Sequence, residues 1–195
     1  MQVDKASGLI AGACFVDSPN RGARPAGQVP ELIVVHGISL PAGQFGGGHI
    51  TELFTNQLDT RGDARFAHLA GVRVSAHLLI ARDGHVTQYV PFGQRAWHAG
   101  GSVFQGRSDC NDFSIGIELE GTDTQPYRTI QYETLERLIT ALRDAYPAIG
   151  DDRVVGHCHI APGRKSDPGP GFEWQRLQRN LGIHCPVTQR RALSL

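Results

Sequence analysis

The 195-residue sequence predicts an α/β fold of the α+β type, in which helices flank a central mixed β-sheet of about five strands. Short runs rich in β-branched residues alternate with segments whose apolar residues recur at helical spacing. The 24 glycines and 11 prolines predict many turns, which disfavours a bundle of long helices. With 40% apolar residues the chain can bury a core. We therefore expect a single domain over residues 1–195, with its core at about 30–182, an irregular lead-in at 1–29 and a tail at 183–195.

The first half of the chain predicts three strands and one helix. Leu32–His36 is a β-branched run that ends at a glycine, which is typical of a buried strand. The glycine-rich stretch Pro41–Gly48 is expected to be a loop, and apolar residues at helical spacing predict a helix over Ile50–Leu58. Val72–Ala81 alternates as a strand does. An Asp-Gly turn follows it, so His85–Val90 is expected to return as a hairpin partner.

The second half predicts two more strands and two helices. Gln94–Asn111 is expected to be a long loop, and Phe113–Glu120 alternates strictly between apolar and polar or small residues, as a strand does. Thr129–Tyr146 carries one apolar stripe and is followed by proline, which predicts an amphipathic helix. Arg153–His157 is a short strand. Phe172–Leu181 is expected to form the closing helix.

Charge and hydropathy disfavour several classes of function. Lysine plus arginine and aspartate plus glutamate number 19 each, so the formal net charge is 0. This balance argues against binding to nucleic acid or to an anionic membrane. The apolar stretch Ala6–Val16 is short and glycine-rich for an export signal, and no segment is long enough to span a bilayer. We expect a cytoplasmic monomer.

Two histidines occupy equivalent places at the ends of predicted strands. His36 ends Leu32–His36, and His157 ends Arg153–His157. A lone histidine at a strand end is more often structural, but two of them can meet at one edge of a sheet, where ligand sites collect. Asp167 follows His157 in a loop rich in proline and glycine. Two imidazoles and one carboxylate suit Zn²⁺ with an open fourth position, although Asp167 is also explained as a turn residue before proline.

A zinc hydrolase also needs a base and a positive group for the oxyanion. Glu118 and Glu120 share one face of the predicted strand Phe113–Glu120. A glutamate within so apolar a strand is expected to be desolvated, which raises the pKa of its carboxyl toward a useful value. The pattern does not choose between the two, and a solvated strand face is the alternative. Lys165, close to Asp167 in sequence, either reaches the same cavity to stabilise negative charge or lies on an exposed loop.

Several motifs occur in an order that resembles a known family. They are Val34-Val35-His36, Val74-Ser75-Ala76-His77, Arg95-Ala96-Trp97-His98-Ala99-Gly100, Asn111-Asp112-Phe113-Ser114-Ile115-Gly116-Ile117-Glu118-Leu119-Glu120-Gly121, Gly156-His157 and Asp167-Pro168-Gly169. Together they resemble the N-acetylmuramoyl-L-alanine amidase type 2 family over nearly the whole chain. Within that family the sequence is most similar to cytosolic enzymes that act on 1,6-anhydromuramyl peptides. The resemblance implies a mixed sheet flanked by helices, as in peptidoglycan recognition proteins.

The resemblance also implies a role for each candidate residue. The residues that match the ligands of one Zn²⁺ ion per chain are His36, His157 and Asp167. Glu118, rather than Glu120, matches the catalytic glutamate, and Lys165 matches the lysine that supports the tetrahedral intermediate. The implied reaction is hydrolysis of the amide between the lactyl group of 1,6-anhydro-N-acetylmuramic acid and L-alanine in recycled cell-wall fragments. The implied partner is therefore a small-molecule anhydromuropeptide.

Two positions depart from the pattern of the family. Gly37 stands where asparagine usually follows the first zinc ligand, which removes a polar contact. His159 stands where close relatives usually carry aspartate, and it shares a face with His157 if the strand continues. His159 is therefore a rival metal ligand, although the spacing to Lys165 and Asp167 favours His157.

Substrate-binding residues are less sharply defined. Trp97 is suited to stack on a sugar, with packing inside a loop as the alternative. Arg73 and Arg164 carry forked donors that suit peptide carboxylates, with simple solvent exposure as the alternative. His77 and His98 are expected to be packing histidines, and lining of the cleft is the second interpretation for both.

Four alternatives compete with a recycling amidase. A non-catalytic peptidoglycan-binding module would have lost a ligand, whereas the full candidate set is present. An exported amidase that acts on intact peptidoglycan would need a stronger leader. A nucleotide-binding loop at Gly163–Ser166 is disfavoured because Arg164 separates the glycine from the lysine. A serine hydrolase is disfavoured because Gly37–Pro41 ends in proline where a nucleophile elbow needs its second glycine.

Overall fold

The computed structural model describes residues 1–184, so most of the tail expected at 183–195 lies outside the described residues. At its centre is a sheet of six strands. In spatial order they are β12 (Val154–Gly156), β5 (Leu32–Ile38), β11 (Ser114–Glu120), β6 (Leu78–Ile80), β7 (Val86–Gln88) and β3 (Cys14–Phe15). The first four run parallel, β7 is antiparallel to β6, and β3 is parallel to β7. The prediction of a mixed sheet flanked by helices is confirmed, with one strand more than expected.

The longest pairing joins β5 to β11 and decides which side chains share a face. Its parallel register places His36 opposite Glu118, so both point to the same side of the sheet. The alternate residues point to the other side and pack against α2 (Thr129–Ala145), where they form the main hydrophobic core. Every residue of β11 is buried, because this strand lies in the middle of the sheet with both faces covered.

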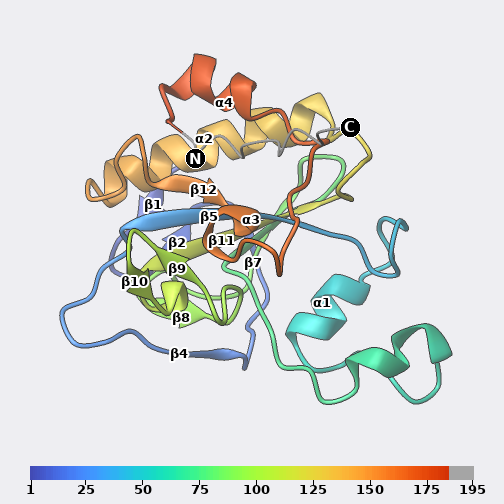
Figure 1. Ribbon diagram of the computed structural model, residues 1–195. Coiled ribbons are helices and arrows are strands. Elements are labelled where there is room, and N and C mark those ends of the chain that lie inside the picture. The colour runs from blue at the N-terminus through green and yellow to red at the C-terminus, as the bar shows by residue number, and fades with distance from the viewer. Residues whose placement is uncertain (185–195) are drawn as a thin grey trace.

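Helices and loops lie on both sides of the sheet (Figure 1). α2 runs along one face, and α4 (Trp174–Leu181) packs against it from outside. α1 (His49–Phe54) and several loops lie on the opposite side. Two smaller apolar clusters stabilise that side, one including Tyr89 and the other including Phe113. In residues 1–184 no helix is long and apolar enough to cross a lipid bilayer.

Several predicted elements are shorter than expected, and for two of them the local contacts show the cause. The strand predicted at Val72–Ala81 is reduced to its last part, because the backbone before it bonds to loops; the N–H of Ser75, for example, donates to the carbonyl of Trp97 at 3.1 Å. The helix predicted at Ile50–Leu58 ends early. Asn56 adopts a left-handed conformation with φ 61°, which stops the helix.

Two segments expected to be irregular contain short strands. The predicted loop at 94–111 holds β8 (Gln94–Ala96), β9 (Val103–Phe104), β10 (Arg107–Ser108) and a 3₁₀ turn that begins at its end (Cys110–Asp112). The lead-in at 1–29 holds β1 (Val3–Asp4), β2 (Leu9–Ile10), β4 (Arg21–Ala23) and the edge strand β3. β4 pairs with β8 and so ties the lead-in to the loop. The expectation of irregular structure is wrong at these residues, because strands of two or three residues are too short for alternation to reveal.

Candidate active site

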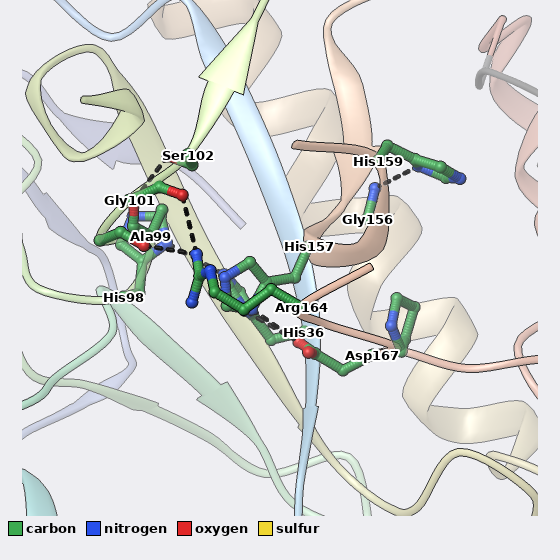
Figure 2. A network of polar contacts seen from close by, with 12 residues as sticks. His36, His98, Ala99, Gly101, Ser102, Gly156, His157, His159, Arg164 and Asp167 are labelled. Carbon is green, nitrogen blue, oxygen red and sulfur yellow. Dashed lines mark hydrogen bonds and ion pairs between the residues drawn. The ribbon is translucent and has the colours of Figure 1, made fainter. Parts of the chain in front are cut away.

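His36 and His157 reach the same edge of the sheet from neighbouring parallel strands. His36 lies near the carboxyl end of β5, and His157 follows β12 as the first residue of the short helix α3 (His157–Ile160). Carboxyl ends of parallel strands meet at one edge, where α/β sheets commonly bind ligands. Asp167 comes from the loop after α3. Figure 2 shows the three side chains converging.

Each of these three side chains presents one atom to a common point. Nδ1 of His36 lies 3.0 Å from Nδ1 of His157 and 3.1 Å from Oδ2 of Asp167, and the last two atoms are 3.1 Å apart. Ligands of a tetrahedral zinc ion with bonds of about 2.0–2.1 Å lie about 3.3 Å apart, so the triangle fits one face of such a tetrahedron. Within residues 1–184 no other group of histidine, cysteine or acidic side chains is gathered in this way.

The chemistry of these donors also fits a divalent cation. Burial lowers the pKa of His36 to about 4, so its ring is neutral at physiological pH and free to act as a ligand. The outer nitrogen of His157, Nε2, is buried and has no hydrogen-bond partner in the described part of the chain. Two neutral imidazoles and one carboxylate suit Zn²⁺ and leave a fourth position open for a water molecule or a substrate oxygen.

Glu118 is the acid–base candidate beside this triangle. It is 8% exposed, and its register partner on β5 is His36. Its Oε2 atom has no hydrogen-bond partner among residues 1–184. Burial and the nearby Asp167 carboxylate raise the pKa of Glu118 well above its usual value, and Lys165 opposes this shift. A carboxylate in this environment is suited to accept a proton and return it.

Glu120 shares the strand face but has different surroundings. Its two carboxylate oxygens accept hydrogen bonds from the backbone N–H groups of Gly46 and Arg82, the latter at 3.1 Å. The side chain thus fastens the glycine-rich loop Pro41–Gly48 to the sheet. Alternation alone left two candidate glutamates, and these contacts favour Glu118 as the one available for chemistry.

A cavity of about 220 Å³ lies over the candidate ligands. The residues that form its walls are His36, Gly37, Ile38, Phe54, Val74, Ser75, Trp97, His98, Glu118, His157, Lys165 and Asp167. Trp97 and Lys165, both predicted from sequence, are therefore brought to the site. Trp97 is partly exposed and Lys165 is exposed on the loop after α3. Phe54 and Val74 supply apolar walls that no sequence pattern indicated as part of a site.

The two candidate arginines do not form the cavity wall. Arg73 is exposed and directly precedes Val74. Arg164 donates from one terminal nitrogen to the carbonyl oxygens of Gly100 at 2.5 Å and Gly101 at 3.0 Å (Figure 2). It thereby ties the loop after α3 to the loop after β8, next to the cavity. Substrate binding by either arginine stays a prediction.

His98 and His77 are buried behind the candidate ligands, as expected for packing histidines. Burial lowers the pKa of His98 well below its usual value and that of His77 to about 3. Nδ1 of His77 accepts a hydrogen bond from the N–H of Gly116 at 3.0 Å. His98 also forms part of the cavity wall and lies 2.9 Å from Nε2 of His36. Sequence reasoning missed this contact, since it depends on the path of a loop.

The prediction that His159 rivals His157 as a ligand is wrong. The chain after β12 enters α3 instead of continuing as a strand, and two helical residues rotate a side chain by about 200°. Figure 2 shows His159 directed away from the site. Its Nδ1 accepts a hydrogen bond from the N–H of Gly156 at 2.9 Å, and its ring packs on Trp174 with 5.4 Å between centroids.

The hydroxyl of Tyr127 occupies the space beside Gly37, where any other residue would place its side chain. A Cβ atom at position 37 would collide with the hydroxyl oxygen of Tyr127. That hydroxyl donates to the carbonyl of Pro168 at 3.0 Å, directly after Asp167. The tyrosine thus supports the loop that carries a candidate ligand, from the space that a larger residue at position 37 would need.

Two histidines and a carboxylate at the edge of a mixed sheet, with a buried glutamate beside them, form the type of site found in zinc hydrolases. Comparison with known proteins identifies the family. The family model described as N-acetylmuramoyl-L-alanine amidase matches residues 26–170. The chain is 55% identical over 171 residues to 1,6-anhydro-N-acetylmuramyl-L-alanine amidase AmpD of Escherichia coli (strain K12), covering 88% of this chain and 93% of the relative. The chain belongs to the N-acetylmuramoyl-L-alanine amidase family.

Solved structures agree with this assignment. A crystal structure of a selenomethionine AmpD derivative superposes with a TM-score of 0.88 at 52% identity, covering 94% of this chain and 100% of that one. AmiD from Escherichia coli, solved with the substrate anhydro-N-acetylmuramic acid-L-Ala-D-gamma-Glu-L-Lys, has a TM-score of 0.60 at 31% identity, covering 86% of this chain and 64% of that one. The chain therefore has the amidase fold and is an enzyme of this amidase class.

Proposed function

We propose that this enzyme hydrolyses the amide between the lactyl group of 1,6-anhydro-N-acetylmuramic acid and L-alanine in recycled cell-wall fragments, with one Zn²⁺ ion. Two comparisons support the substrate: AmpD is named for the 1,6-anhydro-N-acetylmuramyl-L-alanine bond, and AmiD was solved with an anhydromuramyl tripeptide. The observation that carries the proposal is the position of Glu118. Its carboxylate, with one oxygen unpartnered among residues 1–184, lines the same cavity as the three candidate ligands.

His36, His157 and Asp167 are the residues that would hold the ion, because their three donor atoms form the 3.0–3.1 Å triangle. A bound Zn²⁺ would lower the pKa of a water molecule from about 15.7 toward about 7 and polarise the scissile carbonyl. The protein's part is to hold this donor set at the floor of a cavity that also contains an acid–base group. The neutral ring of His36 favours metal binding over protonation at physiological pH.

Glu118 and Lys165 supply the remaining chemistry. Glu118 accepts the proton of the attacking water and then delivers it to the amine nitrogen of the departing L-alanine. Its raised pKa makes Glu118 a stronger base than a carboxylate of ordinary pKa. It also lets the carboxyl hold the proton until the proton passes to the amine nitrogen. The ammonium of Lys165 stabilises the negative charge that develops on the carbonyl oxygen. Trp97, partly exposed in the cavity wall, offers an aromatic face to the sugar.

Metal content and activity test this proposal together. Purified protein is analysed for zinc and assayed on an anhydromuropeptide before chelation, after chelation and after zinc is restored. We expect about one zinc per chain, loss of hydrolysis on chelation and recovery with zinc. Hydrolysis that survives complete removal of metal would contradict zinc dependence. Zinc-loaded protein that binds the fragment without cleaving it would instead support a peptidoglycan-binding module.

We further propose that the enzyme acts in the cytoplasm on free fragments rather than on intact peptidoglycan. The chain covers 93% of the length of AmpD but only 64% of AmiD, which supports similarity to the first enzyme over its whole length. Cell fractionation of a tagged copy, together with turnover of anhydromuropeptide against purified sacculi, tests this. Release of peptide from sacculi at a comparable rate would favour the exported alternative.

A further inference from the structure

A chain of hydrogen bonds leads from the candidate ligand His36 away from the cavity. Nε2 of His36 lies 2.9 Å from Nδ1 of His98, which stands next to it in Figure 2. On the other side of that ring, Nε2 of His98 lies 3.2 Å from the hydroxyl oxygen of Ser114. Ser114 in turn donates to the carbonyl oxygen of Cys110 at 2.5 Å. All four residues are buried, so water does not compete for these contacts.

The carbonyl at the end of this chain fixes the direction of each hydrogen bond. A carbonyl oxygen can only accept, so the single hydroxyl hydrogen of Ser114 points to Cys110 and its oxygen accepts from Nε2 of His98. A neutral imidazole has one N–H, so Nδ1 of His98 is an acceptor for the N–H at Nε2 of His36. Nδ1 of His36 then carries a lone pair, and it is the atom that faces the other two candidate ligands.

The backbone holds the ring of His98 in this position. The N–H groups of His98 and Ala99 both donate to the side-chain oxygen of Asn111, at 3.1 and 2.7 Å. The ring lies directly over Gly116 of β11, where a Cβ atom would come within 2.5–2.7 Å of three ring atoms. A glycine is therefore required at this point by close approach, and the strand and the loop together determine where the ring lies.

We propose that His98, oriented by Ser114, is a positioning residue that fixes the tautomer and the orientation of the zinc ligand His36. This inference rests on the proposed zinc site and adds a residue that acts through a ligand instead of touching the metal. The outer nitrogen of a ligating histidine usually donates to a partner of this kind, and loss of that partner lowers metal affinity by about 10–100-fold. In this enzyme the partner is a second histidine.

The hydrogen bonds from His36 through His98 and Ser114 to Cys110 form a relay, and the zinc affinity of two variants at position 98 tests it. His98→Leu removes the acceptor with a side chain of similar bulk, whereas His98→Asn places a carbonyl oxygen near the position of Nδ1. By competition with a chromophoric chelator, we expect about 10–100-fold weaker zinc binding for leucine and no more than about threefold for asparagine. Circular dichroism of the metal-free variants checks folding. Unchanged affinity in His98→Leu, or equal losses in both variants, would overturn the proposal.

A measurement on the unaltered protein does not depend on how the variants fold. With ¹⁵N-labelled histidine and no metal, we expect a scalar coupling across the hydrogen bond between Nε2 of His36 and Nδ1 of His98, with the hydrogen on His36. Absence of the coupling, or a hydrogen on Nδ1 of His98, would overturn the relay. If the protein binds no zinc, the proposed function fails while this coupling still reports on the relay, so the two failures are distinguishable.

Ser114→Ala provides a third arm with a matched control. It removes the acceptor for Nε2 of His98, so we expect zinc affinity to fall toward the lower end of the range, by about tenfold. The control is Ser18→Ala, a fully buried serine whose hydroxyl donates to the carbonyl of Phe54 at 2.6 Å, outside the relay. We expect this control to leave zinc affinity unchanged. Equal losses in the two variants would indicate general loosening and overturn the proposal.

Discussion

The two histidines of the candidate zinc site are held in different ways. His36 lies within the longest strand pairing, and its outer nitrogen is bonded to His98. His157 begins a four-residue helix at the edge of the sheet, and its outer nitrogen is buried without a hydrogen-bond partner in residues 1–184. A buried polar atom without a partner costs free energy. On the strand side of the site, His36 is thus oriented by a hydrogen-bond partner within the fold, whereas on the loop side the outer nitrogen of His157 has no such partner among residues 1–184.

The residues beside each histidine follow the same contrast. Glu118 is buried in the central strand, while Lys165 is exposed on the loop after α3. That loop is held by a few contacts, among them Arg164 to the carbonyl of Gly100 and Tyr127 to the carbonyl of Pro168. The proposed proton-transfer group therefore lies on the strand side and the proposed charge-stabilising group on the loop side.

On the strand side, Glu118→Gln removes the proton-accepting carboxylate while keeping the size and shape of the side chain. An amide of the same size cannot accept the proton of water, so we expect turnover to fall by about 10²–10⁴-fold while zinc content stays at the wild-type level. Single-turnover assays and metal analysis on the same sample measure both quantities. Normal turnover with zinc bound would show that another group is the base.

On the loop side, Asp167→Ala removes the carboxylate of a candidate zinc ligand. Because it removes one of three donors and the only negative charge among them, we expect zinc affinity to fall by more than the about 100-fold that marks loss of an outer partner. Chelator competition measures the affinity. Asp144→Ala, on the outer surface of α2, is the matched control and should leave it unchanged. Stoichiometric zinc at unchanged affinity in Asp167→Ala would remove this residue from the ligand set.

Lys165→Met tests whether a residue on the loop side influences the pKa of Glu118 on the strand side. Loss of an oxyanion-stabilising charge should lower kcat by about 10²-fold. Lys165 also lowers the pKa of Glu118, so its removal raises that pKa further. The base must be unprotonated, and activity is lost as pH falls through its pKa. The acid limb of the kcat/KM profile should therefore move to higher pH.

The control for this prediction is the neighbouring cation. Arg164→Met removes a positive charge that is bonded to backbone carbonyls and is not among the groups that shift the pKa of Glu118. We expect its acid limb to stay in place. A shift of equal size in both variants would mean that net charge, and not the position of Lys165, sets the pKa of the base.

The strand side was also the part that sequence predicted best. The β-branched run ending at His36 and the alternation around Glu118 are regular patterns, and β5 and β11 form where those patterns lie. The loop side has no such period. The pattern around His157 allows the strand to continue, in which case His159 would share its face, and it does not indicate the four-residue helix that follows β12. The contact between His98 and His36 joins residues 62 positions apart and follows only from the folded path of a loop.

Glu120→Gln gives the smallest expected effect on catalysis and separates support from chemistry on one strand face. Its carboxylate accepts hydrogen bonds from the backbone N–H of Gly46, in the loop Pro41–Gly48, and from that of Arg82. A glutamine amide would replace one accepting oxygen with an NH₂ group, so one of these two N–H donors would face another donor. We expect a loss of about 1–3 kcal/mol in the free energy of unfolding, measured with urea at fixed zinc, and turnover within about threefold of wild type. If Glu120→Gln instead abolished turnover as Glu118→Gln does, the distinction between a supporting and a reacting glutamate would be wrong.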